Sequence, residues 1–68
     1  MMEPGDIVTL TDRGINKGLY KTLIDQGMEI TAIVEKISKN RALVTVRVIH
    51  SGVSAKWHST FWRKKNEQ

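Results

Sequence analysis

The most regular alternation of hydrophobic and polar positions lies between residues 42 and 50. One side of that segment carries Ala42, Val44, Val46 and Val48, and the other carries Leu43, Thr45, Arg47 and Ile49. Successive side chains of an extended strand point to opposite faces. The period of two therefore predicts a β-strand whose valine face lies in the core.

Residues 7–11 and 28–37 are rich in β-branched residues and also predict strands, and residues 55–58 predict the start of a fourth strand. Residues 59–62 predict a single 3₁₀ turn that leads into a short fifth strand. Polar turns separate the strands. In the turn at residues 38–41, Asn40 is the residue that we expect at positive φ.

The segment of residues 15–27 allows two structures. Apolar side chains recur there every four residues, at Ile15, Leu19 and Leu23. With Asn16 as a possible N-cap and Gly27 as a C-cap glycine, this stripe predicts a short helix near residues 17–26. The interior Gly18 opposes a helix by about 1 kcal/mol relative to alanine. The alternative is a long, partly ordered loop whose leucines close one end of a barrel.

Together these segments predict one mainly β domain over residues 1–68, with four or five antiparallel strands and one short helix or long loop after the first strand. Its basic end, residues 63–68, is expected to be partly frayed. The opening Pro4-Gly5-Asp6-Ile7-Val8-Thr9-Leu10, the long connection, the central hairpin and the ending with Trp57 and Phe61-Trp62 resemble the SH3-like small barrels of short bacterial and phage proteins. That resemblance implies a small barrel, and SH3-like barrels bind DNA, RNA, peptides and other proteins.

The 68 residues contain no cysteine, which excludes disulfides and thiolate zinc sites. No apolar run approaches the ~20 residues that span a bilayer. The first residues, Met1-Met2-Glu3-Pro4, lack the basic start and apolar stretch of a signal peptide. We therefore expect a cytoplasmic protein that does not associate with a membrane.

Positive charge is concentrated in the second half of the chain. Residues 1–34 carry three basic and five acidic side chains, whereas residues 35–68 carry eight basic and two acidic ones, so the net charge of +4 divides into −2 and +6. A basic surface attracts phosphates or acidic protein surfaces through its summed field. The alternative is an ordinary surface of solvated lysines.

Catalysis finds little support in the sequence. His50 and His58 are the only histidines, and two imidazoles without a third ligand make a weak metal site. No carboxylate lies between Arg47 and Lys65 to orient a histidine that activates a neighbouring serine. We therefore expect no catalytic residues, no bound metal and no cofactor.

The ten residues 56–65 are the first candidate binding segment, because they hold three of the four aromatic residues and four positive charges. Cations meet phosphates, and flat rings stack on bases. The aromatic residues are also the natural core of so small a domain. If the segment is a continuous strand, Trp57 and Trp62 point to opposite faces, and we expect Trp57 in the core and a partly exposed Trp62 beside Arg63, Lys64 and Lys65.

The second candidate is a positive stripe on the outward face of the sheet. Arg47 lies in the middle of its predicted strand on the face opposite the valines. Lys36 and Lys56 lie on predicted neighbouring strands, where they align with Arg47 if the strands pair in sequence order. Small β-sheet proteins bind nucleic acids with such surfaces. The alternative is an ordinary solvated face.

Two hypotheses follow for the function of a non-enzymatic binding module. In the first, Lys36, Arg47, Lys56, Trp62, Arg63, Lys64 and Lys65 bind nucleic acid, either DNA or RNA. In the second, the chain is a protein-interaction adaptor or a small phage-like inhibitor that binds an acidic protein surface, with Leu43, Ile49 and Trp62 as an apolar anchor. A homodimer through an exposed strand edge is compatible with either hypothesis.

Overall fold

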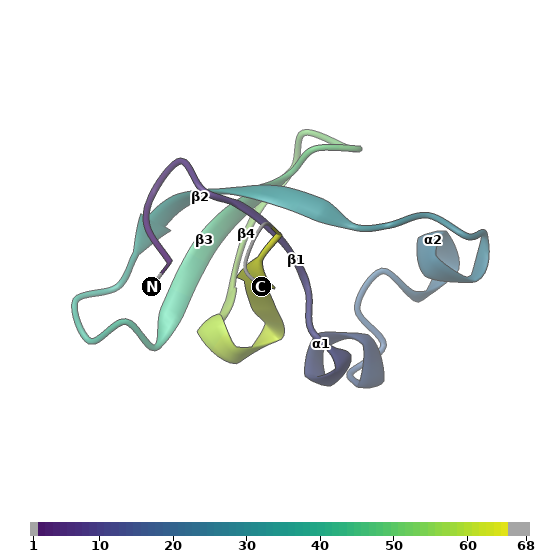
Figure 1. Ribbon diagram of the computed structural model, residues 1–68, viewed down its shortest axis with the longest axis horizontal. Helices are drawn as coiled ribbons and strands as arrows, with labels where there is room; N and C mark the ends of the chain where they lie inside the picture. Colours follow the sequence, from purple (N-terminus) through teal and green to yellow (C-terminus); the bar gives the residue numbers. More distant parts are fainter. Residues whose placement is uncertain (1, 66–68) are drawn as a thin grey trace.

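The computed structural model describes residues 2–65 and is mainly β, as the sequence predicts. Its elements, in chain order, are β1 (Ile7–Leu10), α1 (Asp12–Asn16), α2 (Lys21–Asp25), β2 (Thr31–Ile37), β3 (Leu43–Val48), β4 (Ser54–His58), the 3₁₀ turn η1 (Ser59–Phe61) and β5 (Trp62–Lys64). The strands form one antiparallel sheet in the order β4-β3-β2-β1-β5 (Figure 1). The sheet is open, with β4 at one edge and β5 at the other.

One face of the sheet carries the core. The valine face of β3 is buried, as its alternation predicts, and it packs with the inward residues of β1, β2 and β5. The buried hydrophobic residues are Val8, Leu10, Ile30, Ala32, Val34, Val44, Val46, Val48 and Trp62. Most of these side chains are β-branched, which suits close packing on a pleated surface.

A β-bulge interrupts the pairing of β2 with β3. Val34 pairs with Val46 and Lys36 with Thr45, so that Glu35 is the extra residue of β2. A bulge of this kind shifts the inward-outward alternation by one position. Glu35 and Lys36 are consequently both exposed, and Ile37 returns to the core side opposite Val44.

The connection between β1 and β2 contains two short helices instead of the single helix near residues 17–26 or the long loop that the sequence suggests. Asn16 is the last residue of α1 and not the N-cap of a later helix, because the N-cap of α2 is Tyr20. The N-cap of α1 is Thr11, whose side chain accepts a hydrogen bond from the Gly14 amide. The chain then leaves the right-handed region at Gly18 and Tyr20, whose φ angles are +83° and +56°. A helical stripe cannot continue through two left-handed residues, so the apolar period of four is split between α1 and α2.

The expected C-cap at Gly27 is confirmed. Gly27 has a φ of +85°, and its amide donates to the carbonyl of Ile24. The amide of Met28 donates to the carbonyl of Leu23 at 3.1 Å. These two bonds are those of a Schellman motif, which ends α2 and turns the chain into β2.

The prediction for the two tryptophans is wrong. Trp62 is only 3% exposed and belongs to the core, whereas Trp57 is partly buried. The cause is η1, because its three residues interrupt the period of two between the tryptophans. Trp57 on β4 and Trp62 on β5 therefore both face inward, and Tyr20 lies between them with ring-centroid distances of 6.3 and 6.4 Å.

The turn between β2 and β3 also differs from its prediction, since Arg41 and not Asn40 has a positive φ, of +62°. The Asn40 side chain instead closes the turn, accepting from the Ser38 hydroxyl at 2.8 Å and from the Ala42 amide at 3.0 Å. Asn40 thereby contributes through its side-chain oxygen, which is the other common use of asparagine in turns.

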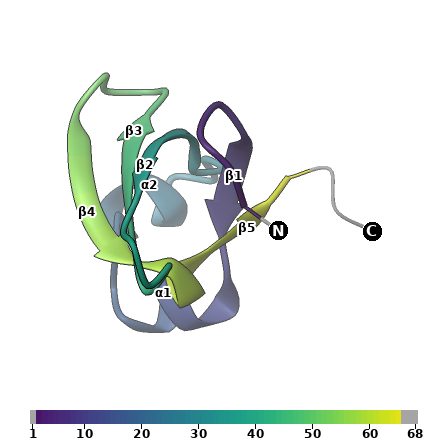
Figure 2. The same cartoon turned by 90° about the vertical axis from the view of Figure 1, so that its left-hand side faces the viewer.

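The β5 strand extends over Arg63 and Lys64, and the Lys65 amide donates to the Ile7 carbonyl at 2.9 Å. Part of the basic end is thus ordered by pairing with β1, and the expected fraying of residues 66–68 lies outside the described residues. Figure 2 shows β4 and β1 on opposite sides of the view, with β5 running from the lower end of β4 toward β1. Over residues 2–65, no helix has the length and apolar character that a membrane crossing requires.

Candidate binding surface

The register of the sheet gathers three predicted binding residues on one surface. Lys36 on β2 pairs with Thr45 on β3, and Thr45 pairs with Lys56 on β4. Neighbouring strands lie about 4.8 Å apart, so the two lysines start about 10 Å from each other on either side of a hydroxyl. Arg47 lies in the adjacent row, between Ile33 and Ser54.

We call the outward side of β2, β3 and β4 the outer face and define it by Lys36, Thr45, Arg47, Ser54, Lys56 and His58. The three cations and His58 are exposed. The backbone beneath them is held by hydrogen bonds to neighbouring strands and by the valine core on the other side. The outer face therefore presents its charged groups from a rigid support.

Glu35 adds one negative charge to the outer face and orients two of its residues. Its Oε1 accepts a hydrogen bond from the Ser54 hydroxyl at 2.7 Å, and its Oε2 lies 3.8 Å from Nε of Arg47. At this exposure the pair contributes at most about 1 kcal/mol to stability. The contact involves Nε of Arg47 and not its terminal nitrogens.

Lys36 and Lys56 make no ion pair with any residue that the structure describes. Three cations and one carboxylate leave the outer face with a local charge of +2. Charges on a common face add their fields, which favours the approach of an anionic partner.

The predicted residues of the C-terminal segment do not form a single basic-aromatic surface. Trp62 is in the core, Nζ of Lys64 lies 3.8 Å from Asp6, and Nζ of Lys65 lies 2.7 Å from Glu29. Arg63 is exposed without an ion pair to the described residues. Of this segment, only Arg63 and Lys56 present charge that a carboxylate within residues 2–65 does not offset.

No protein-family model, curated protein or solved structure matches this chain. Residues 2–65 also contain no group of three or more histidine, aspartate and glutamate side chains arranged to hold a metal ion.

Sequence reasoning missed His58 and Ser54 as members of the outer face. Both alternate with Lys56 along β4, so the period of two within residues 54–58 was the signal that would have included them. The carboxylates that neutralise Lys64 and Lys65 had no such signal in the sequence. Asp6 and Glu29 are far from them in sequence, and only the pairing of β5 with β1 brings them near.

Proposed function

We propose that the chain is a small non-enzymatic binding module that contacts the phosphate backbone of nucleic acid with the outer face of β2, β3 and β4. The observation that carries the proposal is the row Lys36-Thr45-Lys56 with Arg47 beside it, on strands whose register fixes their spacing. Cations that neutralise phosphates release condensed counterions, and this release supplies most of the affinity in sequence-independent binding.

The rest of the outer face suits the same partner. The hydroxyls of Thr45 and Ser54 are donors of the kind that commonly contact phosphate oxygens. The exposed ring of His58 lies one row beyond Lys56, where it can stack on an unpaired base. These features favour backbone contact with DNA or RNA over reading of a base sequence.

We also propose that the fold is of the SH3-like small-barrel type. The order of the strands, the long connection between β1 and β2, and the 3₁₀ turn between β4 and β5 support this assignment. The tryptophans of the two edge strands approach through Tyr20, so side-chain packing spans the opening in the sheet. Small barrels present such curved outer surfaces to nucleic acids and to proteins.

A second candidate function is binding to a protein, as an adaptor or phage-like inhibitor. The anchor formed by Leu43, Ile49 and Trp62 is ruled out in that form, because Trp62 is buried. Ile49 and Val53 favour the candidate instead, since they are 50% and 61% exposed in the connection between β3 and β4. The open edge at β4 also permits pairing with a second copy of the chain.

The test is a salt titration of binding to mixed-sequence double-stranded DNA, single-stranded DNA and RNA. With about three phosphate contacts, log K should fall against log salt with a slope near −3 on duplex DNA and near −2 on single strands. Lys56→Ala should weaken binding several-fold and reduce the slope by about one. Lys65→Ala is the matched control and should have little effect, because Glu29 already offsets that charge.

Two results would contradict the nucleic-acid proposal. One is the absence of binding at low salt to all three polymers, which would leave the protein-binding candidate. The other is an equal loss of affinity in Lys56→Ala and Lys65→Ala, which would show that net charge and not the outer face determines binding.

A further inference from the structure

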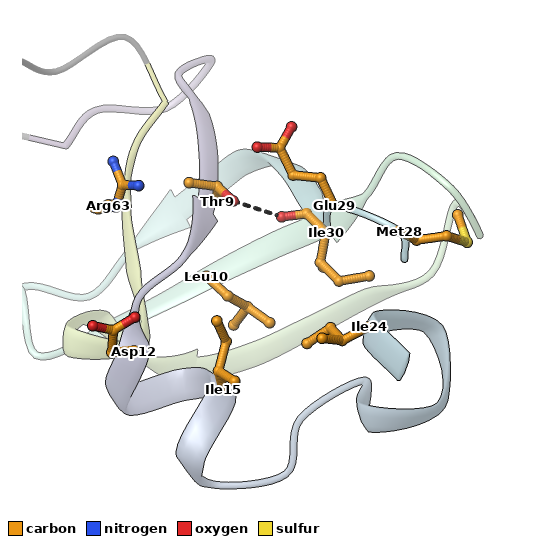
Figure 3. Close-up of a pocket in the computed structure, with 9 residues that line it drawn as sticks. All are labelled: Thr9, Leu10, Asp12, Ile15, Ile24, Met28, Glu29, Ile30 and Arg63. Atoms are coloured by element: carbon orange, nitrogen blue, oxygen red, sulfur yellow. Dashed lines mark hydrogen bonds between the residues drawn. The ribbon is translucent and has the colours of Figure 1, made fainter. Parts of the chain in front are cut away.

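A cleft separates the β1–β2 connection from the sheet and is independent of the three cations of the outer face. Its volume is about 250 Å³, and its lining comes from β1, both helices, the segment before β2, and β5. Neither Lys36 nor Arg47 nor Lys56 contributes to it. Leu10, Ile15 and Ile24 point toward one another in the middle of the cleft (Figure 3).

The floor of the cleft is apolar and well supported. Leu10 and Ile30 belong to the core, while Ile15 is 42% exposed and Ile24 is partly buried. The Thr9 hydroxyl donates to the Ile30 carbonyl at 3.0 Å, which ties β1 to the start of β2 beneath the cleft. An aliphatic side chain inserted here would cover Ile15 and gain about 25 cal/mol for each Å² of apolar area removed from water.

Opposite charges lie at one end of the cleft. Figure 3 shows Asp12 on α1 and Arg63 on β5 at the end away from Met28. Both are exposed, and neither makes an ion pair with any residue of the described chain. The remaining charged residue, Glu29, is paired with Lys65 at 2.7 Å.

These charges favour a peptide over a nucleic acid as the occupant. The unpaired carboxylate of Asp12 disfavours a phosphate backbone at this end of the cleft, whereas Asp12 and Arg63 together complement one basic and one acidic side chain. Neighbouring residues of an extended peptide point to opposite sides, as Arg63 and Asp12 lie on opposite sides of that end of the cleft. The apolar floor accepts a third, aliphatic side chain.

We propose that this cleft is a docking site for an extended segment of a partner protein that inserts a leucine- or isoleucine-sized side chain. An acidic residue of the segment pairs with Arg63, and its basic neighbour pairs with Asp12. The site is distinct from the outer face, so the chain has the means to hold a nucleic acid and a protein at the same time.

Amide chemical shifts of the ¹⁵N-labelled protein provide the test, with two acetylated and amidated peptides as probes, Gly-Leu-Gly-Glu-Lys-Gly and its reversed sequence. At least one should bind with a Kd of about 0.1–1 mM, which is the range expected for so short a peptide. The shifts should concentrate at Leu10, Ile15, Ile24 and Ile30. Replacing the leucine of the probe by serine should abolish them.

Variants separate docking from non-specific contact. Arg63→Glu should weaken binding of the Glu-Lys probe about fivefold and strengthen binding of a Lys-Lys probe, because an exposed ion pair is worth up to about 1 kcal/mol. Ile15→Ser should weaken both probes, and its partial exposure makes the change compatible with folding. Lys56→Glu, on the outer face, should leave peptide binding unchanged.

Three results would overturn the proposal. The first is the absence of shifts with either peptide at roughly 5 mM, well above the expected Kd. The second is binding of the serine probe that equals binding of the leucine probe. The third is a set of shifts on β2, β3 and β4 that Lys56→Glu removes, which would assign peptide binding to the outer face.

Discussion

Replacing Trp62 by alanine will remove a large part of the protein's free energy of unfolding. Trp62 is 3% exposed on β5 opposite Leu10, and truncating a buried tryptophan costs about 3–5 kcal/mol. A domain of this length has a total stability of about 3–10 kcal/mol. Urea denaturation followed by circular dichroism measures the loss.

Two further tryptophan variants make the test decisive. Trp57→Ala should cost about 1–2 kcal/mol, because Trp57 retains solvent contact. Trp62→Phe should cost less than about 1.5 kcal/mol, since it keeps a ring in the core and removes an indole N–H that has no hydrogen-bond partner. A larger loss in Trp57→Ala than in Trp62→Ala would contradict the placement of Trp62 in the core.

The second large effect is expected at Gly14, where α1 packs against η1. A Cβ added there would lie 2.7 Å from Cδ2 of Leu10 and 2.9 Å from the carbonyl oxygen of Phe61. That oxygen accepts a hydrogen bond from the Thr11 amide at 2.9 Å, so it does not yield easily. Gly14→Ala should therefore destabilise the protein by about 2 kcal/mol, although alanine is the better helix former.

Asn16→Ala is the matched control for Gly14→Ala, because it changes an exposed position of the same helix. Its effect should stay within about 0.5 kcal/mol in the same urea denaturation. If Gly14→Ala matched the control or stabilised the protein, the close packing of α1 on η1 would be wrong.

Local patterns in the sequence were sufficient for most of the sheet. The alternation in β3 depends only on which face is buried, and the valines at 44, 46 and 48 are buried as predicted. The Gly27 cap was readable because a Schellman motif depends on a few neighbouring residues. These features are set by short-range geometry.

The failed predictions involve interruptions in otherwise regular patterns. The period of two predicted an outward-facing Trp62, because that prediction treated the segment as one continuous strand. The 3₁₀ turn directly before Trp62 breaks this period. The split into two helices requires a left-handed Tyr20, and a tyrosine gives no sequence signal for that conformation. In that position Tyr20 contacts both tryptophans, so tertiary packing determines its backbone.

The candidate binding residues also divide into those that local patterns located correctly and those whose environment depends on residues far away in the sequence. Lys36, Arg47 and Lys56 were found because strands joined by short turns pair in sequence order. Lys64 and Lys65 are neutralised by partners at positions 6 and 29. Counting charges along the sequence therefore overestimated the positive charge that the basic end presents to a partner. The outer face, with a smaller but less compensated charge, is the better candidate.

Chemical-shift mapping of the ¹⁵N-labelled protein with a short mixed-sequence DNA at low salt tests the central claim most directly. We expect the largest amide shifts at Lys36, Thr45, Arg47 and Lys56, and we expect them to disappear as salt is raised. Shifts that concentrate on Trp62–Lys64, or no shifts at any salt concentration, would contradict the assignment of the outer face as the nucleic-acid surface.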